Sequence, residues 1–206
     1  MIEKEVAEKL VEVAQILGRM LEQSFYAFRK PTEASVEEVE QAVNQVKQSS
    51  AELTHFLIAK SSSDEKGKEW IKPYLSIASN FERMTYNIEG LIRQLKLMTK
   101  EQIFFSDRGV KEINDVFQEA MDFLESLPEI ILTQNKSLAQ HIGEQVRLVM
   151  KIANAYAGEH EERLLRGICL PKSSPIYLGI LESLKGVIVY TLEVGGTVAS
   201  LAAKSR

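Results

Sequence analysis

Apolar residues recur at helical spacing along most of this 206-residue chain. The first stretch has apolar side chains three or four positions apart, at Val6, Leu10, Val13, Leu17, Met20 and Leu21. This period is typical of an amphipathic helix. The pattern predicts six helices, at about residues 3–28, 36–60, 73–99, 107–127, 137–165 and 174–203. We therefore expect an all-α protein.

Residues that favour or break helices suggest where these segments begin and end. Ser35 is a good N-cap, and Glu38 three positions later completes the capping-box pattern. Pro73 is expected in the first turn of the third helix, where proline is tolerated. Pro128 is expected to end the fourth helix, unless that helix continues to Thr133. The connections are short, as in an antiparallel bundle.

The apolar pattern of the first half of the chain repeats in the second half. A shift of 103 residues, half of the 206-residue length, places Tyr74 on Tyr177 and needs no gap. Few matched residues are identical, so the repeat is one of hydrophobic pattern. A period this long indicates one folded unit used twice. We predict two tandem antiparallel three-helix bundles related by internal duplication, at residues 1–103 and 104–206.

The last predicted helix contains a segment, residues 186–203, that is apolar enough to resemble a membrane span. Glu193 falls within it, however, and a spanning helix disfavours an acid in its middle. Residues 187–191 are mostly β-branched and also favour a strand. The matching segment, residues 81–98, carries charges with apolar residues at helical spacing between them. We therefore expect residues 186–203 to form a buried or interface helix that does not cross a membrane.

Composition limits the classes of function. The formal net charge of −4 argues against a nucleic-acid surface, which needs a basic face. Cys169 is the only cysteine, so an intramolecular disulfide is excluded and a reducing compartment such as the cytoplasm is favoured. Residues 1–5 are too charged for a signal peptide. The sequence has no phosphate-binding glycine loop and no hydrolase motif, so we expect no enzyme activity.

The two halves differ most between their second and third helices. Residues 60–72 are polar and are expected to form a mobile loop, whereas residues 163–175 are apolar and contain their own turn residues. Trp70 stands in the polar segment. It either caps the end of the bundle or, if exposed, contacts a partner, because tryptophan is enriched in binding hot spots.

Residues 159–181 carry a more specific motif. A helix ending in His-x-x-Arg-Leu is followed by Gly-x-Cys-x-Pro and by a helix that opens with a Tyr-Leu turn. The residues concerned are His160, Arg163, Leu164, Gly167, Cys169, Pro171 and Tyr177. This motif resembles the second half of PhoU-like domains, most closely those associated with bacterial sodium/phosphate cotransporters. Glu82 and Arg83, on the third predicted helix, resemble the Leu-Glu-Arg-Ile signature of the same family.

The resemblance implies a fold and a function. PhoU-like proteins are tandem pairs of three-helix bundles that regulate phosphate uptake. They act in the cytoplasm, at the inner face of the membrane, by contact with a membrane phosphate transporter or a sensor kinase, and many form homodimers. A regulatory binding protein is therefore our first hypothesis. A helical bundle that binds iron or zinc and a purely structural dimerisation module are the alternatives.

The resemblance also raises the question of a metal site. Many PhoU-like proteins bind iron or zinc clusters through an acid and an aspartate four residues apart on each third helix. Here the first copy has Glu82 and Tyr86, and the corresponding positions of the second copy are Lys185 and Val189. Because three of the four acids are missing and a lysine repels a metal cation, we predict no cluster and no cofactor. Glu82 and Glu89 are weak candidates for a single ion.

Small residues recur every four positions along the last predicted helix, at Thr191, Gly195, Ala199 and Ala203. Such a stripe lets another helix approach closely. Packing within the bundle and contact with a second copy or a transporter are equally compatible with it. His160 falls on the apolar side of its helix, where we expect a core histidine, not a metal ligand.

Overall fold

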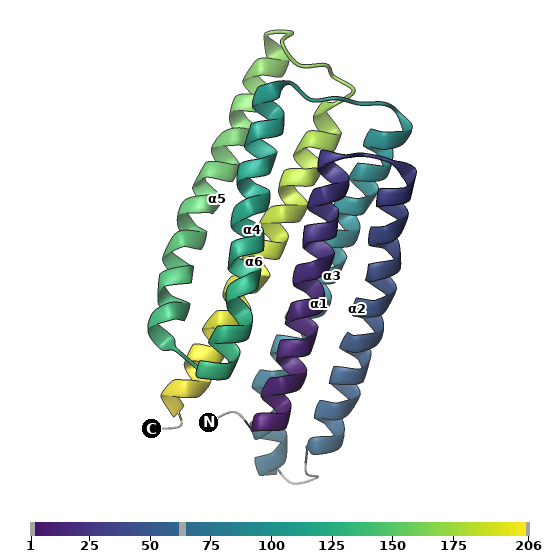
Figure 1. The fold of residues 1–206 in the computed structure, drawn as a ribbon. Helices are drawn as coiled ribbons and strands as arrows, with labels where there is room; N and C mark the ends of the chain where they lie inside the picture. Colours follow the sequence, from purple (N-terminus) through teal and green to yellow (C-terminus); the bar gives the residue numbers. More distant parts are fainter. Residues whose placement is uncertain (1–2, 62–64, 205–206) are drawn as a thin grey trace.

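The computed structural model describes residues 3–61 and 65–204, and these residues form helices joined by short connections, with no strand (Figure 1). The helices are α1 (Lys4–Arg29), α2 (Glu33–Lys60), α3 (Glu65–Lys100), α4 (Asp107–Thr133), α5 (Lys136–Leu165) and α6 (Ser174–Lys204). The prediction of an all-α protein is confirmed. The helical segment at residues 187–191 also excludes the strand that their β-branched side chains favoured.

Helices α1, α2 and α3 pack on one another, and so do α4, α5 and α6. The two bundles meet where α1 lies against α4 and α3 lies against α6, while α2 and α5 flank the molecule on opposite sides (Figure 1). Helix α4 begins 103 residues after α1, and α5 begins 103 residues after α2. The prediction of two tandem three-helix bundles is confirmed, and the division between residues 103 and 104 stays a prediction.

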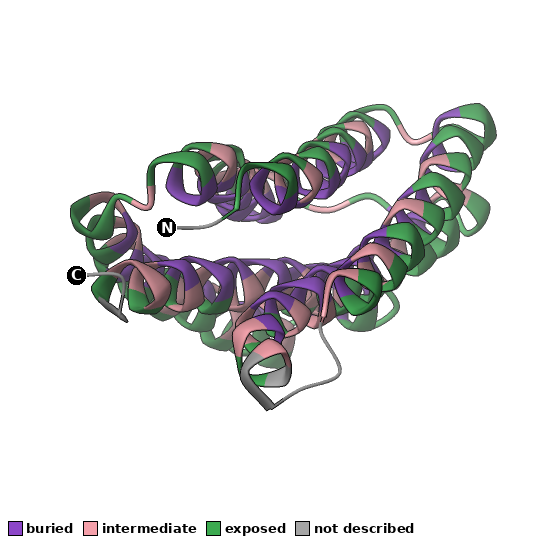
Figure 2. Ribbon diagram, turned by 90° about the horizontal axis from the view of Figure 1, so that it is seen from below, coloured by how far each residue is buried: buried purple, intermediate pink, exposed green. Residues whose placement is uncertain are grey.

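Apolar faces of all six helices form one continuous core. Figure 2 shows the buried residues on the sides of the helices that face one another and the exposed residues on the outer sides. The largest fully buried side chains are Tyr177, Phe81, Phe117, Leu10, Leu17 and Met20. Removal of this apolar surface from water is the main force that holds the bundles together.

Helices α3 and α6 approach each other closely because α6 carries glycines at the contact. A Cβ atom on Gly186 would lie 2.0 Å from Asn87 Oδ1, and one on Gly179 would lie 2.7 Å from the side chain of Gln94. Heavy atoms do not approach so closely, so a side chain at Gly186 would have to displace the carboxamide of Asn87. Glycine at this position thus leaves room for the Asn87 side chain between the two helices.

Helix α2 begins three residues earlier than the sequence predicted. Its N-cap is Thr32, whose Oγ1 accepts a hydrogen bond of 3.1 Å from the Ser35 backbone N–H. Ser35 Oγ in turn accepts 3.1 Å from the Thr32 N–H, which completes a reciprocal capping box. Ser35 was predicted as the N-cap with Glu38 as its partner, and that assignment is wrong because Thr32 and Ser35 form the same pattern one turn earlier.

Helix α3 begins at Glu65, so most of the loop expected at residues 60–72 is helical, and residues 62–64 of it lie outside the described residues. Pro73 was expected in the first turn and lies well inside the helix. Ile71 and Tyr74 are both buried in the core on either side of it. Burial of these side chains favours the helix strongly enough to offset the hydrogen bond that proline removes.

Helix α4 continues past Pro128 to Thr133, which was the open alternative. Ile130 and Ile131 are buried beyond the proline, and their packing explains why the helix continues. The helix ends at Thr133, and its C-cap Gln134 adopts the left-handed conformation with φ of 52°. This conformation terminates a helix because the next amide turns away from the helical path.

Helix α6 is long and apolar enough to cross a membrane by length and composition, since an 18-residue window within Ser174–Ala203 has a mean hydropathy of 1.5. About a third of this window (33%) is buried inside the molecule, where α6 packs against α3, α4 and α5. The core helix of a soluble protein meets the same criterion, so the apolar composition of α6 does not by itself indicate a membrane span.

Candidate partner-binding site

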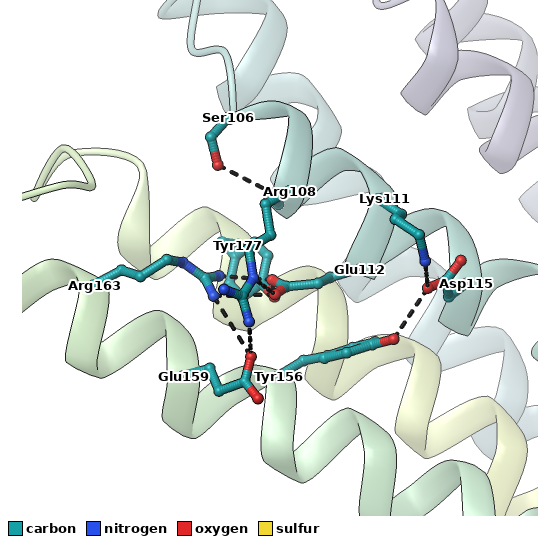
Figure 3. Close-up of polar contacts among 10 residues, drawn as sticks. Ser106, Arg108, Lys111, Glu112, Asp115, Tyr156, Glu159, Arg163 and Tyr177 are labelled. Carbon is teal, nitrogen blue, oxygen red and sulfur yellow. Dashed lines mark hydrogen bonds and ion pairs between the residues drawn. The ribbon is translucent and has the colours of Figure 1, made fainter.

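A buried carboxylate joins three helices at one end of the second bundle (Figure 3). Glu112 of α4 is 3% exposed, and both of its oxygens accept hydrogen bonds from Arg163 of α5, at 3.0 Å to Oε1 and 2.6 Å to Oε2. The hydroxyl of Tyr177 of α6 donates to Oε2 at 2.5 Å, and Arg108 Nε donates to Oε1 at 2.9 Å. Four donors therefore satisfy one buried acid, and we call these residues the Glu112 network.

Glu112 stays ionised within this network. Burial disfavours the charged form of Glu112, but hydrogen bonds from Arg163, Tyr177 and Arg108 outweigh burial and lower its pKa. Burial raises the pKa of Tyr177, and the hydrogen bond to the Glu112 carboxylate raises it further, so the phenol stays protonated as a donor. Arg108 extends the network to the surface, where it also pairs with Glu159.

His160 packs against the same tyrosine. Its ring stacks on the Tyr177 ring with centroids 4.2 Å apart and planes 17° apart, and its Nε2 forms a hydrogen bond of 3.0 Å with Ser174 Oγ. Burial lowers the pKa of His160, and the positive charge of Arg163 lowers it further. The expected role as a buried core histidine agrees with this environment.

The α5–α6 turn is closed by backbone hydrogen bonds to the end of α5. The Ile168 N–H donates to the Arg163 carbonyl at 2.9 Å, and the Gly167 N–H donates to the Leu164 carbonyl at 3.0 Å. These two bonds form a Schellman motif, and Gly167 adopts the left-handed conformation it requires, with φ of 70°. The residue that anchors the turn is thus Arg163, which also binds Glu112.

Large apolar side chains project into solvent beyond this fixed turn. They are Leu165 at the end of α5, Ile168 and Leu170 of the α5–α6 connection, and Phe104 of the α3–α4 connection, with Leu165 88% and Phe104 78% exposed. An ion pair of 2.6 Å between Lys172 and Glu101 joins the two connections, which lie at the same end of the molecule (Figure 1). We call these four side chains the apolar tip. Several exposed large apolar side chains at one end of a molecule are typical of protein interaction sites.

Comparison with known proteins identifies the fold. No protein-family model and no curated protein matches the sequence. Among solved structures, the phosphate transport system regulatory protein PhoU from Streptococcus pneumoniae superimposes with a TM-score of 0.74 over 97% of this chain and 94% of that one. This chain has a PhoU-like fold. The sequence identity is 14%, so the likeness concerns the fold alone.

The signature residues of the PhoU-like fold fall into two groups. His160, Arg163 and Tyr177 come together around Glu112, with Gly167 in the turn between them. The other members of the turn are half-buried Leu164, half-buried Cys169 and exposed Pro171. Glu82 and Arg83 lie elsewhere, on the outer side of α3, where both are exposed. The sequence motif therefore marks two separate places: the Glu112 network with the α5–α6 turn, and the exposed side of α3 that carries Glu82 and Arg83.

Glu112 is the residue that sequence reasoning missed. Its partner Arg163 lies 51 residues further along the chain, so no local motif connects them. A signal was available, because Glu112 precedes Ile113 on the apolar side of the fourth helix, where an unpaired acid is costly. That signal becomes specific only when the rotation of α4 against α5 is known.

Trp70 lies in a helix and is half-buried, contrary to its expected place in a loop. Its ring packs against Tyr74 of the same helix, with centroids 5.1 Å apart and planes inclined at 52°. The loop assignment is wrong because the helix starts at Glu65 and carries Trp70 on its inner side. Contact of Trp70 with a partner stays a prediction.

The stripe of small residues on α6 divides between the interior and the surface. Thr191 and Gly195 are buried within the bundle, and Thr191 Oγ1 donates to the Val187 carbonyl at 3.0 Å. Ala199 is half-buried and Ala203 is exposed. Only the outer two members are therefore available to a second protein without rearrangement of the helices.

The positions that the sequence resemblance marks for a metal do not fit a metal here. Glu82 is exposed, and Glu89 pairs with Lys47 of α2 at 2.5 Å. Lys185, which corresponds to Glu82, pairs with Glu182 at 2.6 Å. Within residues 3–61 and 65–204 there is no group of three or more His, Cys, Asp or Glu that could hold a metal ion. The residues present therefore disagree with the iron or zinc cluster that the resemblance implies.

Proposed function

We propose that this chain is a regulatory protein of phosphate uptake that acts in the cytoplasm without catalysis of its own. It works by direct contact with a membrane phosphate transporter or a sensor kinase. One solved structure with the same fold is a phosphate transport system regulatory protein, and the two chains match over nearly their whole lengths. The observation that carries the proposal is the apolar tip, which is exposed and includes residues of the α5–α6 turn that is anchored on Arg163 of the Glu112 network.

The chemistry of the tip suits a protein partner. Burial of exposed leucine, isoleucine and phenylalanine side chains stabilises a complex, because each removes apolar surface from water. Charged residues close in sequence to the tip form ion pairs, Arg166 with Glu162 at 3.7 Å and Lys172 with Glu101 at 2.6 Å. An apolar centre with a polar rim is the usual anatomy of a protein interface. The rigid turn also lowers the entropy cost of binding.

Pairing of two copies is a second part of the proposal. The outer end of α6 offers Ala199 and Ala203, and small residues there allow close approach of another helix. Ala203→Glu would place a charge in that contact, and sedimentation velocity would report a shift from dimer to monomer. An unchanged sedimentation coefficient, or a wild-type chain that is already monomeric, would exclude this surface as a dimer contact.

The tip can be tested with purified protein and solubilised membranes. The wild-type chain, immobilised through a terminal tag, is expected to retain a phosphate transporter or a sensor kinase from a membrane fraction. Ile168→Ser combined with Leu170→Ser should abolish retention, because the double change removes apolar contact surface from the tip. Both side chains are exposed, so the fold should remain stable. Leu132→Ser is the matched control, since Leu132 is also exposed but lies at the opposite end of α4.

The outcomes separate the hypotheses clearly. Loss of the transporter or kinase with the double variant, but not with Leu132→Ser, supports the proposal. Equal retention by all three proteins would show that the tip is not the contact surface. Recovery of neither partner, under conditions that recover a known transporter–regulator pair, would count against the proposed function itself.

A further inference from the structure

A groove runs between α1 and α4, which lie side by side and point in opposite directions (Figure 1). Its volume is about 830 Å³, and it follows α1 from Ala14 to Phe25 and α4 from Gln118 to Pro128. A helical stretch of this length spans about 16 Å, or about three turns. No residue of the apolar tip lines the groove, so the two surfaces are separate.

The two sides of the groove are built from corresponding positions of the internal repeat. Five pairs of lining residues are 103 positions apart: Gln15 and Gln118, Gly18 and Met121, Arg19 and Asp122, Glu22 and Glu125, and Phe25 and Pro128. The groove therefore lies where the two halves of the molecule meet. Because α1 and α4 are antiparallel, each end of the groove has one glutamine, one glutamate and one apolar side chain.

The floor of the groove is apolar. Phe25, Met121 and Pro128 are half-buried along it, and buried Leu124 also lines it. Gly18 adds no side chain, and a Cβ atom at this position would have no other atom within 4 Å. A second helix can therefore approach α1 closely at Gly18, while the flexible methionine adapts to the side chains that it brings.

The rim of the groove has an excess of negative charge. Glu22, Asp122 and Glu125 are exposed there, together with one cation, Arg19. Within residues 3–61 and 65–204, none of these four side chains forms an ion pair, and Asp122 accepts a hydrogen bond of 2.8 Å from the amide of Gln118. Three carboxylates against one guanidinium leave the rim ready to pair with added cations.

The negative charge continues along α4. Residues 113–135 contain no lysine, arginine or histidine. Burial raises the pKa of Glu119, and the negative charges of Asp122 and Asp115 raise it further, so the acids on this helix repel one another. Two copies of this chain that met groove to groove would place like charges against each other, which disfavours a second copy as the occupant.

We propose that the groove binds a basic amphipathic helix of a partner protein. Apolar side chains of that helix pack on Phe25, Met121 and Pro128, and its lysine or arginine side chains pair with Glu22 and Glu125. Docking of an amphipathic helix in an apolar groove is a recurrent mode of peptide recognition. The groove is a contact surface separate from the apolar tip, so the inference goes beyond the proposed function and does not rest on it.

The probe that tests the proposal is a synthetic peptide of about 14 residues, which fills the groove when helical. It carries leucine at every third or fourth position and lysine elsewhere, so that one face is apolar. Fluorescence anisotropy with the purified full chain should show saturable binding of one peptide per chain, weaker as the salt concentration rises. The same peptide with glutamate in place of lysine should not bind. A scrambled lysine–leucine peptide without an apolar face should bind about tenfold more weakly or worse, because it loses apolar contacts.

A side chain placed at Gly18 should block the groove. Gly18→Leu adds its side chain where the protein leaves open space, and leucine favours a helix more than glycine does. The variant should therefore melt at the same temperature as the wild type or higher, and yet bind the lysine peptide about tenfold more weakly or worse, because it loses apolar contacts. Gly158→Leu on α5 is the matched control, since a Cβ atom there also has nothing within 4 Å, and it should bind as the wild type does.

Charge variants separate the rim from the net charge of the protein. Glu22→Gln combined with Glu125→Gln should weaken binding and make it less dependent on salt, because two ion pairs with the peptide are lost. Glu37→Gln combined with Glu144→Gln changes the net charge equally at exposed positions of α2 and α5 and should have little effect.

Three results would overturn the proposal. The first is the absence of saturable binding of the lysine peptide at millimolar concentrations. The second is competition by spermine, or binding of the scrambled peptide, as tight as binding of the amphipathic peptide, which would show attraction to charge alone. The third is an equal effect of each variant and its control. None of these results bears on retention of a transporter by the apolar tip, so the two proposals fail independently.

Discussion

In each half of the molecule, an ion pair joins the end of the middle helix to the beginning of the first helix. We call this junction the corner, and it is built differently in the two halves. In each half, a cation at the end of the middle helix faces the start of the first helix. In the second half, Arg163 pairs with buried Glu112. In the first half, the equivalent residue is Lys60, which pairs with Glu3 at 2.5 Å and with Glu5. The position of the cation is kept, and the position of the acid is not.

Burial is what separates the two corners. The side chains of Arg163 and Glu112 are 11% and 4% exposed, whereas those of Glu3 and Glu5 are 46% and 58% exposed. A surface ion pair contributes little because water and salt screen it. A buried pair is expensive to form and still more expensive to break. The second corner is therefore the rigid one, and it is the corner that carries the apolar tip.

Tyrosine occupies the corresponding position in both halves, which makes the difference sharper. Tyr177 donates its hydroxyl to Glu112. Tyr74 is buried as well, and its pKa is raised by burial and then by the charge of Glu3. The position that corresponds to Glu112 in the first half is Lys9, which pairs along α1 with Glu12 at 3.0 Å. One sequence position thus decides whether the buried tyrosine joins an ionic network.

Removal of the buried acid should have the largest effect. Glu112→Ala leaves Arg163 buried without its counter-charge and should lower the free energy of unfolding by about 3–5 kcal/mol. Urea denaturation followed by circular dichroism would measure the change. Glu5→Ala is the matched control in the first half, where the loss should be much smaller. Equal losses in the two variants would show that the corners do not differ in energy.

Replacement of the whole pair should cost less than removal of one partner. Glu112→Leu combined with Arg163→Met removes both charges, and buried ion pairs can often be replaced by apolar residues without large loss. Tyr177 loses its acceptor, which costs about 1–3 kcal/mol. The double variant should therefore unfold at a higher urea concentration than Glu112→Ala, and lower stability than that single variant would contradict the comparison.

The repeat and the helical periods were enough to predict six helices and the paired bundles, because both depend on local apolar spacing. Helix ends were less predictable. Pro73 was expected in a first helical turn, and Pro128 was expected to end a helix unless that helix continued to Thr133. Burial of Ile71 and Ile130 extends the helices across both prolines. Tertiary packing overrides the local preference of proline in both cases, and a pattern of spacing does not contain that packing energy.

The candidate site was predictable only in part, for a similar reason. The motif located His160, Arg163 and Tyr177, since these residues lie within 18 positions of one another. Glu112 and the exposed Phe104 belong to a different segment and reach the same end of the molecule only through the packing of α4 against α5 and α6. Contacts between distant segments depend on helix rotation, which hydrophobic periodicity fixes too loosely to pair individual polar residues.

His160 offers a smaller test of the comparison, because the matching residue in the first half is Leu57. The folded protein lowers the pKa of His160 below the ordinary value of about 6.5, so the unfolded chain binds its proton more readily. The contribution of His160 is complete above that value and is lost as the pH falls below it. His160→Leu should therefore show a flatter fall in unfolding free energy from pH 7.5 to about 5.5 than the wild type.

The measurement for His160 is urea denaturation at a series of pH values. The variant also loses the hydrogen bond to Ser174, so its stability at pH 7.5 serves as its own reference. Glu112 stays charged throughout this range because its pKa is lowered, and it adds no slope there. Parallel curves for the wild type and His160→Leu would show that the buried histidine does not set the pH dependence.

The exposed corner should give the smallest effect of all. Lys60→Met removes the cation that pairs with Glu3 and Glu5, but the methionine side chain can still pack near Phe56, over which the ammonium group now lies at 5.4 Å. Water solvates the acids left behind, so thermal unfolding should be nearly unchanged and should depend little on salt. Arg163→Met is the matched change in the second half, and it should lower the midpoint clearly because Glu112 would keep its charge inside the protein. A loss in Lys60→Met as large as that in Arg163→Met would mean that the cation, and not the burial of its acid, determines the strength of each corner.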